Sequence, residues 1–141
     1  MTNGQNNPSS GAQYPTLLIL WVAMLSFTLM YLVVTLILPR SSGPENHLLT
    51  IIFSAVSAFL VVVSFAVKGK VLARSVEAQD TRLVKTGIVL ALALCEGAAI
   101  LGLLDFLVAR DRYYVVLIIF SFMGMVLHFP RRSQLVAASG G

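Results

Sequence analysis

One acidic residue, Glu96, lies deep inside a long apolar segment and is the first candidate for chemistry. The segment covers residues 83–108, which places Glu96 about 13 residues, or on the order of 20 Å of helix, from either end. An ionisable side chain at the centre of a membrane span costs about 3 kcal/mol even on lenient insertion scales, and such residues commonly bind or move ions. Glu96 is therefore a candidate ion-binding residue.

Hydroxyl groups are the candidate partners of Glu96. The apolar bodies of the other segments contain no Lys or Arg, so we expect Glu96 to be largely protonated at neutral pH. If hydroxyls from the other helices converge on it, they could ligate a small cation together with the carboxyl. The alternative is that Ser and Thr bond to their own backbone and share one depth by chance. The hydroxyl residues near the centres of the other apolar segments are Ser26, Thr28, Ser57 and Ser121.

Small residues surround Glu96 at helical spacing, namely Ala91, Cys95, Ala98 and Gly102. They indicate either a seam for close helix packing or a groove for a cofactor, and the pattern favours the seam. Cys95 is the only cysteine, which excludes an intramolecular disulfide, a redox dithiol and a multi-cysteine metal site within one chain. In an apolar setting we interpret Cys95 as a packing residue and not as a nucleophile.

A second acidic residue, Asp105, follows in the same segment. At about 100° per residue it falls on the opposite face of a helix from Glu96, so the two cannot form a carboxylate pair. We expect Asp105 to meet Arg110 or Arg112 near the membrane surface.

Motifs for catalysis are not evident in the chain. We find no metal-ligand cluster, nucleophile and base pair or phosphate-binding loop, so we predict a non-enzymatic protein without a cofactor. The net charge of +4 does not indicate a nucleic-acid partner, because the basic residues flank apolar runs and form no stripe with interleaved aromatics.

The elements that position these residues are apolar helices. Hydrophobic residues make up 57% of the chain and charged residues 11%, far below the roughly 25% charge of soluble domains. We predict an all-α, polytopic membrane protein whose four transmembrane helices form an antiparallel bundle within residues 15–130. The expected helices cover residues 16–38, 48–67, 83–108 and 113–129, with a flexible N-terminal tail at 1–14 and a C-terminal tail at 131–141.

The connections between these helices differ in length and charge. Residues 109–112 are too few to do more than reverse the chain, and residues 39–44 are rich in turn-forming Pro, Ser and Gly. Residues 68–82 form the one substantial polar segment, a predicted cytoplasmic loop that could include a helical extension along the membrane surface. We interpret its basic residues Lys68, Lys70, Arg74 and Arg82 as a docking surface.

The distribution of Lys and Arg predicts the orientation. The side that carries both tails and residues 68–82 holds Lys68, Lys70, Arg74, Arg82, Lys85, Arg131 and Arg132, against Arg40, Arg110 and Arg112 on the other side. By the positive-inside rule, both termini are expected in the cytoplasm of a protein of the cell membrane.

Part of the chain resembles a known family. The segment Ala-Arg-Ser-Val-Glu-Ala at residues 73–78, followed by Ala-Leu-Ala-Leu-Cys-Glu-Gly-Ala-Ala-Ile-Leu-Gly-Leu at 91–103, is similar to the rotor-ring proteolipid, or c subunit, of ATP synthases. The resemblance covers residues 68–108 and implies that Glu96 carries the translocated proton or sodium ion and that Arg74 takes the loop position. The second helix lacks the family's glycine repeat, having Ser54, Ala55, Ser57 and Ala58 instead, and no Gln-Pro follows the arginine.

Two functions follow as expectations. The preferred one is an accessory or structural subunit of a larger membrane complex, with the lipid bilayer and either other membrane subunits or further copies of the chain as partners. The alternative is a proton- or sodium-translocating subunit, or a small ion-coupled transporter, that uses Glu96.

Overall fold

The computed structural model describes residues 10–39 and 43–138, and its regular structure there is entirely helical. Its elements are α1 (Ser10–Ile37), α2 (His47–Glu77), α3 (Thr81–Leu104), the π-helical turn η1 (Asp105–Ala109), α4 (Tyr114–Leu127) and α5 (Arg132–Ala138). The predicted all-α fold is confirmed. The expectations for residues 1–9, for residues 40–42 with Arg40, and for residues 139–141 lie outside the described residues.

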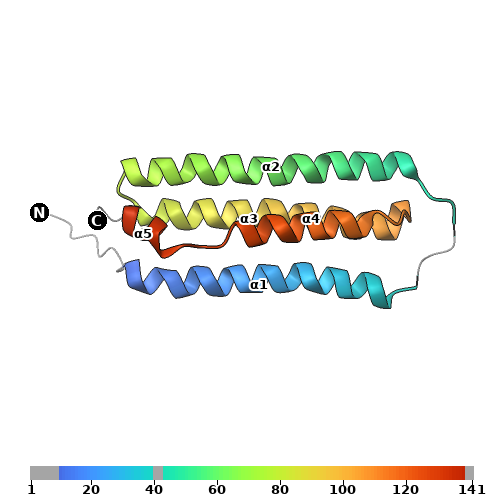
Figure 1. Ribbon diagram of the computed structural model, residues 1–141, viewed down its shortest axis with the longest axis horizontal. Helices are drawn as coiled ribbons and strands as arrows, with labels where there is room; N and C mark the ends of the chain where they lie inside the picture. The colour runs from blue at the N-terminus through green and yellow to red at the C-terminus, as the bar shows by residue number, and fades with distance from the viewer. Residues whose placement is uncertain (1–9, 40–42, 139–141) are drawn as a thin grey trace, which may run out of the picture.

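Several helices are long and apolar enough to cross a membrane, as predicted. Three helices qualify alone, and α4 and α5 would give a fourth span if this pair, bent by 51°, crosses as one unit. Successive long helices run in opposite directions, with α1 and α2 on either side of α3 and α4 (Figure 1). Helix α3 packs against α1, α2 and α4 and is therefore the centre of the fold.

The inward faces of α3 are built from small side chains. Ala91, Cys95 and Ala98 are completely buried, and Gly102 is buried beside α4. A Cβ atom at Gly102 would lie 2.8 Å from Ile118 Cγ1 and 3.2 Å from the Ile118 backbone nitrogen. The four residues of the predicted seam thus lie inside the fold, where they allow neighbouring helices to approach closely.

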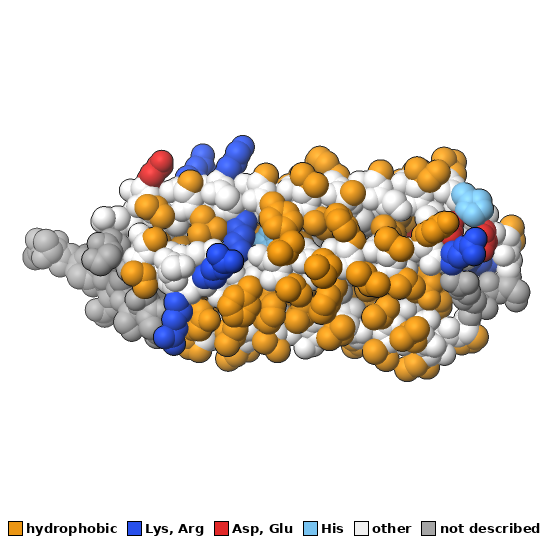
Figure 2. Space-filling view, in the orientation of Figure 1, with side chains coloured by type: hydrophobic (Ala, Val, Ile, Leu, Met, Phe, Trp, Pro, Cys, Tyr) orange, Lys and Arg blue, Asp and Glu red, His pale blue; other side chains and the backbone are white. Residues whose placement is uncertain are grey.

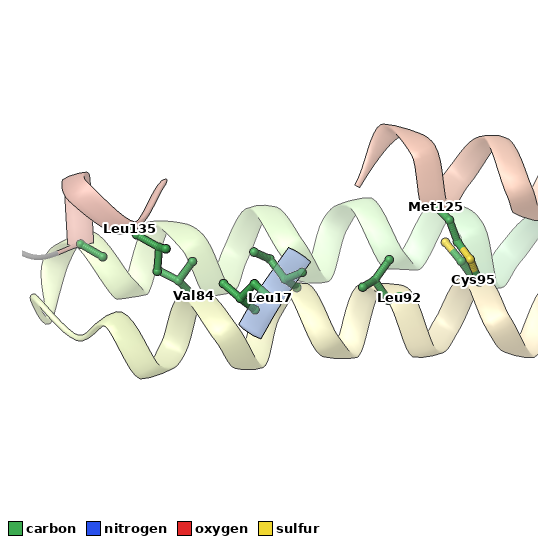
Figure 3. Close-up of a cluster of buried hydrophobic side chains, with 8 residues drawn as sticks. Leu17, Val84, Leu92, Cys95, Met125 and Leu135 are labelled. Atoms are coloured by element: carbon green, nitrogen blue, oxygen red, sulfur yellow. The ribbon is translucent and has the colours of Figure 1, made fainter. Parts of the chain in front are cut away.

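Larger apolar side chains fill the space toward the end that holds α5. Leu17 of α1, Val84 and Leu92 of α3, Met125 of α4 and Leu135 of α5 pack in one cluster with Cys95 (Figure 3). The indole of Trp21 donates a hydrogen bond to the Met125 carbonyl at 2.9 Å. This bond gives the Met125 carbonyl a second donor beside the His128 backbone N–H and ties α1 to the cluster.

Helix α2 extends well beyond its predicted end at residue 67. Most of the expected loop at 68–82 is helical, and the turn occupies only residues 78–80 before α3 begins at Thr81. The extension packs on α3, because Val71 covers Gly87 and Ser75 is buried, while Lys70 and Arg74 remain exposed. A helix of 31 residues is about 46 Å long, so α2 exceeds a hydrocarbon core of about 30 Å.

The expected C-terminal tail from residue 131 is also helical in its described part. Helix α4 has 14 residues, about 21 Å, and ends before Pro130, which can neither donate a backbone hydrogen bond nor continue the helix. Helix α5 then buries Leu135 and Ala138. The guanidinium of Arg132 lies 4.9 Å from the Tyr14 ring centroid, which adds a contact between α5 and α1.

The close contact at Gly102 can be tested with a matched pair of substitutions in α3. We expect Gly102→Ala to lower the free energy of unfolding by about 1–3 kcal/mol, because the added methyl overlaps Ile118. Gly97→Ala meets only Leu60 Cδ1 at 3.6 Å and should be neutral or stabilising, because alanine favours helix. Unfolding in mixed detergent micelles, followed by the fluorescence of the single tryptophan, Trp21, measures both; equal effects would contradict the packing argument.

Candidate functional site

Glu96 is half-buried on α3, where it meets α1. The hydroxyl of Thr28 donates a hydrogen bond to Glu96 Oε2 at 3.3 Å, and Thr28 itself is completely buried. The same hydroxyl lies 3.2 Å from Met125 Sδ. The Tyr31 side chain also hydrogen-bonds to the Glu96 carboxyl. The structure therefore brings Glu96 together with one of its predicted partners.

The three other predicted hydroxyls do not reach Glu96. Ser26 is exposed and donates to the Val22 carbonyl of its own helix at 2.8 Å. Ser57 of α2 donates to the Ala98 carbonyl at 3.3 Å, and Ser121 of α4 donates to the Cys95 carbonyl. Ser57 and Ser121 thus link α2 and α4 to the backbone of α3. Of the four predicted hydroxyl partners of Glu96, only Thr28 contacts it in the described part of the chain, and Tyr31 is an additional partner.

Tyr31 is a contact that sequence reasoning missed. It follows Thr28 by one helical turn, and residues three apart lie on the same helix face. Once Thr28 was considered a partner of Glu96, this spacing was the signal that could have identified Tyr31.

The predicted docking residues lie on helices. Lys68, Lys70 and Arg74 belong to the extension of α2, and Arg82 is in the first turn of α3. Lys and Arg side chains gather toward the end that holds α5, whereas the opposite end mixes basic, acidic and histidine side chains (Figure 2). The groove beside Arg82 on α3 is lined by Lys85, Thr86, Val89, Leu90 and Ala93.

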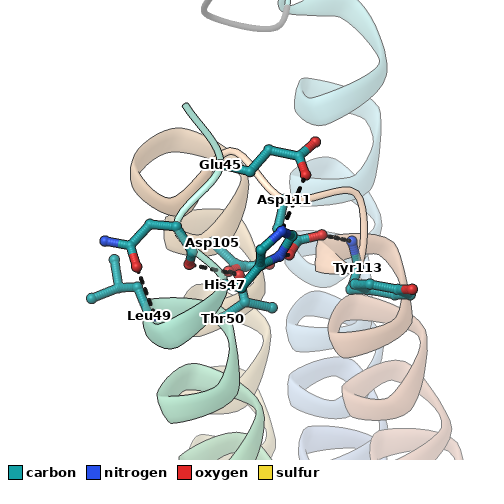
Figure 4. Close-up of polar contacts among 8 residues, drawn as sticks. Glu45, His47, Leu49, Thr50, Asp105, Asp111 and Tyr113 are labelled. Atoms are coloured by element: carbon teal, nitrogen blue, oxygen red, sulfur yellow. Dashed lines mark hydrogen bonds and ion pairs between the residues drawn. The ribbon is translucent and has the colours of Figure 1, made fainter. Parts of the chain in front are cut away.

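A second polar site occupies the opposite end, where the turn at residues 110–113 meets the start of α2 (Figure 4). His47 Nδ1 lies 2.8 Å from Asp111 Oδ2, and His47 Nε2 lies 3.7 Å from Glu45 Oε2. The Asp111 side chain is 2% exposed, whereas those of His47 and Glu45 are 68% and 47% exposed. We call Glu45, His47 and Asp111 the end cluster.

Hydrogen bonds hold the Asp111 carboxylate in its charged form. Burial would raise the pKa of Asp111, but hydrogen bonds from His47 and from the backbone N–H groups of Tyr113 and Arg112 outweigh burial and lower it. The bond from the Tyr113 nitrogen to Asp111 Oδ1 is 3.3 Å long.

Asp105 lies beside the end cluster and is completely buried. Its Oδ1 accepts a hydrogen bond of 2.7 Å from the Thr50 hydroxyl of α2, and Oδ2 has no hydrogen-bond partner among the described residues. Sequence reasoning expected Asp105 to meet Arg110 or Arg112. The Arg110 contact seen is a backbone one, from the Arg110 nitrogen to the Asp105 carbonyl at 2.8 Å, which closes the π-helical turn.

The end cluster is a group of possible metal ligands that the sequence analysis did not identify. One possible ligand atom from each of its three residues lies within 4.8 Å of the others. The sequence carried a usable signal, because Glu45 and His47 precede the second apolar segment and Asp111 follows the third. In a chain that alternates direction, these two connections lie on the same side.

No protein-family model, curated protein or solved structure matches the chain. Its function is therefore argued from its own residues, and the similarity to the rotor-ring proteolipid remains a prediction.

The hydrogen bond between Thr50 and Asp105 can be tested by substitution. We expect Thr50→Val to lower the free energy of unfolding by about 1–3 kcal/mol, because it leaves both oxygens of a buried carboxylate without a donor. Thr50→Ser retains the hydroxyl and should recover most of the loss. As a control, Thr86→Val removes an exposed hydroxyl that bonds to its own helix and should change little. Equal stability of the two valine variants would contradict this account.

Proposed function

We propose that the chain is a non-enzymatic, four-span integral membrane protein that serves as an accessory subunit of a larger membrane complex. The exposed apolar surface of the outer helices supports this proposal. Only 11% of the membrane-spanning window of α1 and 22% of that of α2 are buried within the chain, against 44% of that of α3. Lipid or neighbouring proteins must cover the remaining surface of α1 and α2.

A stripe of small residues on the outer face of α2 carries the proposal. It points away from the face of α2 that buries Ser57, Val61 and Ser64. Nothing lies within 4 Å of the position that a Cβ atom would take at Gly69. Small residues at an exposed position in a membrane helix permit close approach by another helix, as their buried counterparts do in α3. We call the exposed residues Ala55, Ala58, Ala66, Gly69 and Ala73 the outer α2 stripe; the exposed Val62 lies on the same face between Ala58 and Ala66.

The partner that fits the outer α2 stripe is a membrane helix of another subunit or of a second copy of the chain. The described charges favour the orientation in which the end with α5 faces the cytoplasm of a cell-membrane protein. Lys70 and Arg74 flank the last residues of the stripe on that side, where they can meet acidic groups of a partner.

Bulky substitutions in the outer α2 stripe test this proposal. We expect Ala58→Leu and Ala66→Leu to release the chain from its complex, because the added side chains keep helix backbones apart. The measurement is extraction in mild detergent at native abundance, followed by sizing and identification of the co-migrating proteins by mass spectrometry. Ala23→Leu changes an exposed alanine on α1 in the same way and should leave the complex intact.

The outcomes of this experiment separate the possibilities. A large wild-type assembly with other subunits that disappears in the α2 variants supports an accessory role, and a homo-oligomer that disappears identifies a second copy as the partner. A monomeric wild-type protein, or complexes equally stable in all variants, contradicts the proposal.

A second candidate function, ion translocation, is favoured by the surroundings of Glu96. The carboxyl accepts a hydrogen bond from the Thr28 hydroxyl. Because it is only half-buried, a proton or a small cation can reach it. An ionisable group deep in a membrane span is a candidate for binding or moving an ion.

Replacement of Glu96 tests ion translocation. If Glu96 carries an ion, proteoliposomes of the wild-type protein should show pH-dependent proton or sodium flux, and an apolar carbodiimide should modify Glu96. We expect Glu96→Gln to reduce the flux to that of empty liposomes with helicity unchanged, because Gln can still accept from Thr28 but cannot titrate. Glu77→Gln, at the exposed end of α2, is the control and should keep full flux. An unchanged flux in Glu96→Gln would eliminate this candidate.

A further inference from the structure

We propose that Glu45, His47 and Asp111 bind a divalent transition-metal ion of the Zn²⁺ class at the end of the fold opposite α5. This inference does not depend on the function proposed above, because the end cluster shares no residue with Glu96 or with the outer α2 stripe. Its geometric basis is that three ligand atoms from two separate connections lie within 4.8 Å of one another.

The chemistry of the three ligands selects the class of ion. An imidazole nitrogen suits Zn²⁺ and its transition-metal neighbours, whereas Mg²⁺ and Ca²⁺ prefer sites made of oxygen alone. Zn²⁺ with three protein ligands of the nitrogen and oxygen type keeps a fourth position for water. The end cluster supplies one histidine and two carboxylates, and the exposure of His47 and Glu45 gives the ion a route from solvent.

The buried carboxylate of Asp105 is an independent observation that points to a cation. Its Oδ2 has no hydrogen-bond partner among the described residues, although the side chain is completely buried. Asp105 lies near His47 and Asp111 (Figure 4), and the two aspartates repel each other electrostatically. An unpaired buried carboxylate oxygen is costly, and a water bound to the metal would be a suitable donor for Oδ2.

The charges around the end cluster leave room for a cation. The Arg112 guanidinium lies 5.9 Å from the Tyr113 ring centroid, and the Arg110 side chain packs directly against Gly43. The carboxyl groups of Glu45, Asp105 and Asp111 and the guanidinium groups of Arg110 and Arg112 belong to the residues around this end, so the carboxyl groups outnumber the guanidinium groups by one. A cation bound at the end cluster would offset this excess of acidic groups.

A metal at this position would reinforce a contact that already joins two connections. The Asn46 nitrogen donates to the Ala109 carbonyl at 2.9 Å, and the His47 ring reaches Asp111 across the same gap. The ion would fix the start of α2 to the turn between η1 and α4. We therefore expect metal binding to stabilise the folded chain, since a ligand that binds only the folded state shifts its unfolding equilibrium.

Metal titration of the full-length protein tests the proposal. The protein should carry an affinity tag without histidine, be stripped with a chelator and be reconstituted in nanodiscs. Zn²⁺ binding is measured by calorimetry and thermal unfolding, and Co²⁺ serves as a spectroscopic probe through its visible absorption. We expect one saturable equivalent of Zn²⁺ and a higher unfolding temperature with the metal than with the chelator.

Substitutions assign the binding to the end cluster. His47→Gln can keep a hydrogen bond to Asp111 but removes the imidazole, and we expect at least tenfold weaker binding and loss of the Co²⁺ spectrum. Glu45→Gln changes a side chain that is 47% exposed and should also weaken binding. Glu77→Gln, an exposed carboxylate at the other end of α2, should bind as the wild type does. No saturable binding by the wild type, or unchanged binding in both His47→Gln and Glu45→Gln, would overturn the proposal and leave His47 and Asp111 as a hydrogen-bonded pair only.

Discussion

The close approach of α3 to its neighbours is the constraint on which the rest of the structure depends. Lipid chains are as apolar as leucine, so helices in a membrane associate through van der Waals contact and hydrogen bonds and not through the hydrophobic effect. The small faces of α3 make both possible. Gly102 lets the α4 backbone approach, and the short side chains of Ser57 and Ser121 reach backbone carbonyls of α3. Both hydroxyls therefore bond to the backbone of α3 and not to Glu96.

The two ends of the fold differ in their charged groups: basic side chains are exposed at one end, and acidic side chains are buried at the other. At the end with α5, basic side chains such as Lys70 and Arg74 are exposed on α2, a helix longer than a hydrocarbon core of about 30 Å. At the opposite end, acidic groups are buried, and the π-helical turn is the reason. Its wider turn places Asp105 and Ala109 inside, and it leaves Arg110 with a positive φ of 60° where the chain reverses. Asp111 is then held by His47 and by the backbone of its own turn.

The sequence predicted the helical class and the approximate spans because long apolar runs have few alternatives to helix in a membrane. It misplaced the end of α2, because charges were taken as the end of the helix when they mark only the end of the apolar surface. The helical extension depends on Val71 fitting over Gly87, a tertiary contact that hydropathy does not report. Helix α5 was missed for the same reason, since its burial depends on the distant Leu17 and Val84.

The candidate sites also depend on tertiary contacts that the sequence does not report, here at the level of single side chains. Depth in the membrane follows from position in the sequence, but the direction of a side chain around its helix depends on packing. Thr28 and Ser57 were both expected near Glu96, yet Thr28 points to its carboxyl and Ser57 to the Ala98 carbonyl. To predict the end cluster, one would have to know both the direction of its side chains and which two connections lie side by side.

The position of Glu96 bears on how the two proposed functions relate. A glutamine would accept the Thr28 hydroxyl as well as a carboxyl does, so the contact between α1 and α3 does not require an ionisable group. What distinguishes a carboxyl there is its ability to exchange a proton or a cation. Glu96 faces α1, whereas the outer α2 stripe lies on the helix at the other side of α3 (Figure 1). A partner bound to α2 would not contact Glu96, so the two proposed functions are compatible with each other in one subunit.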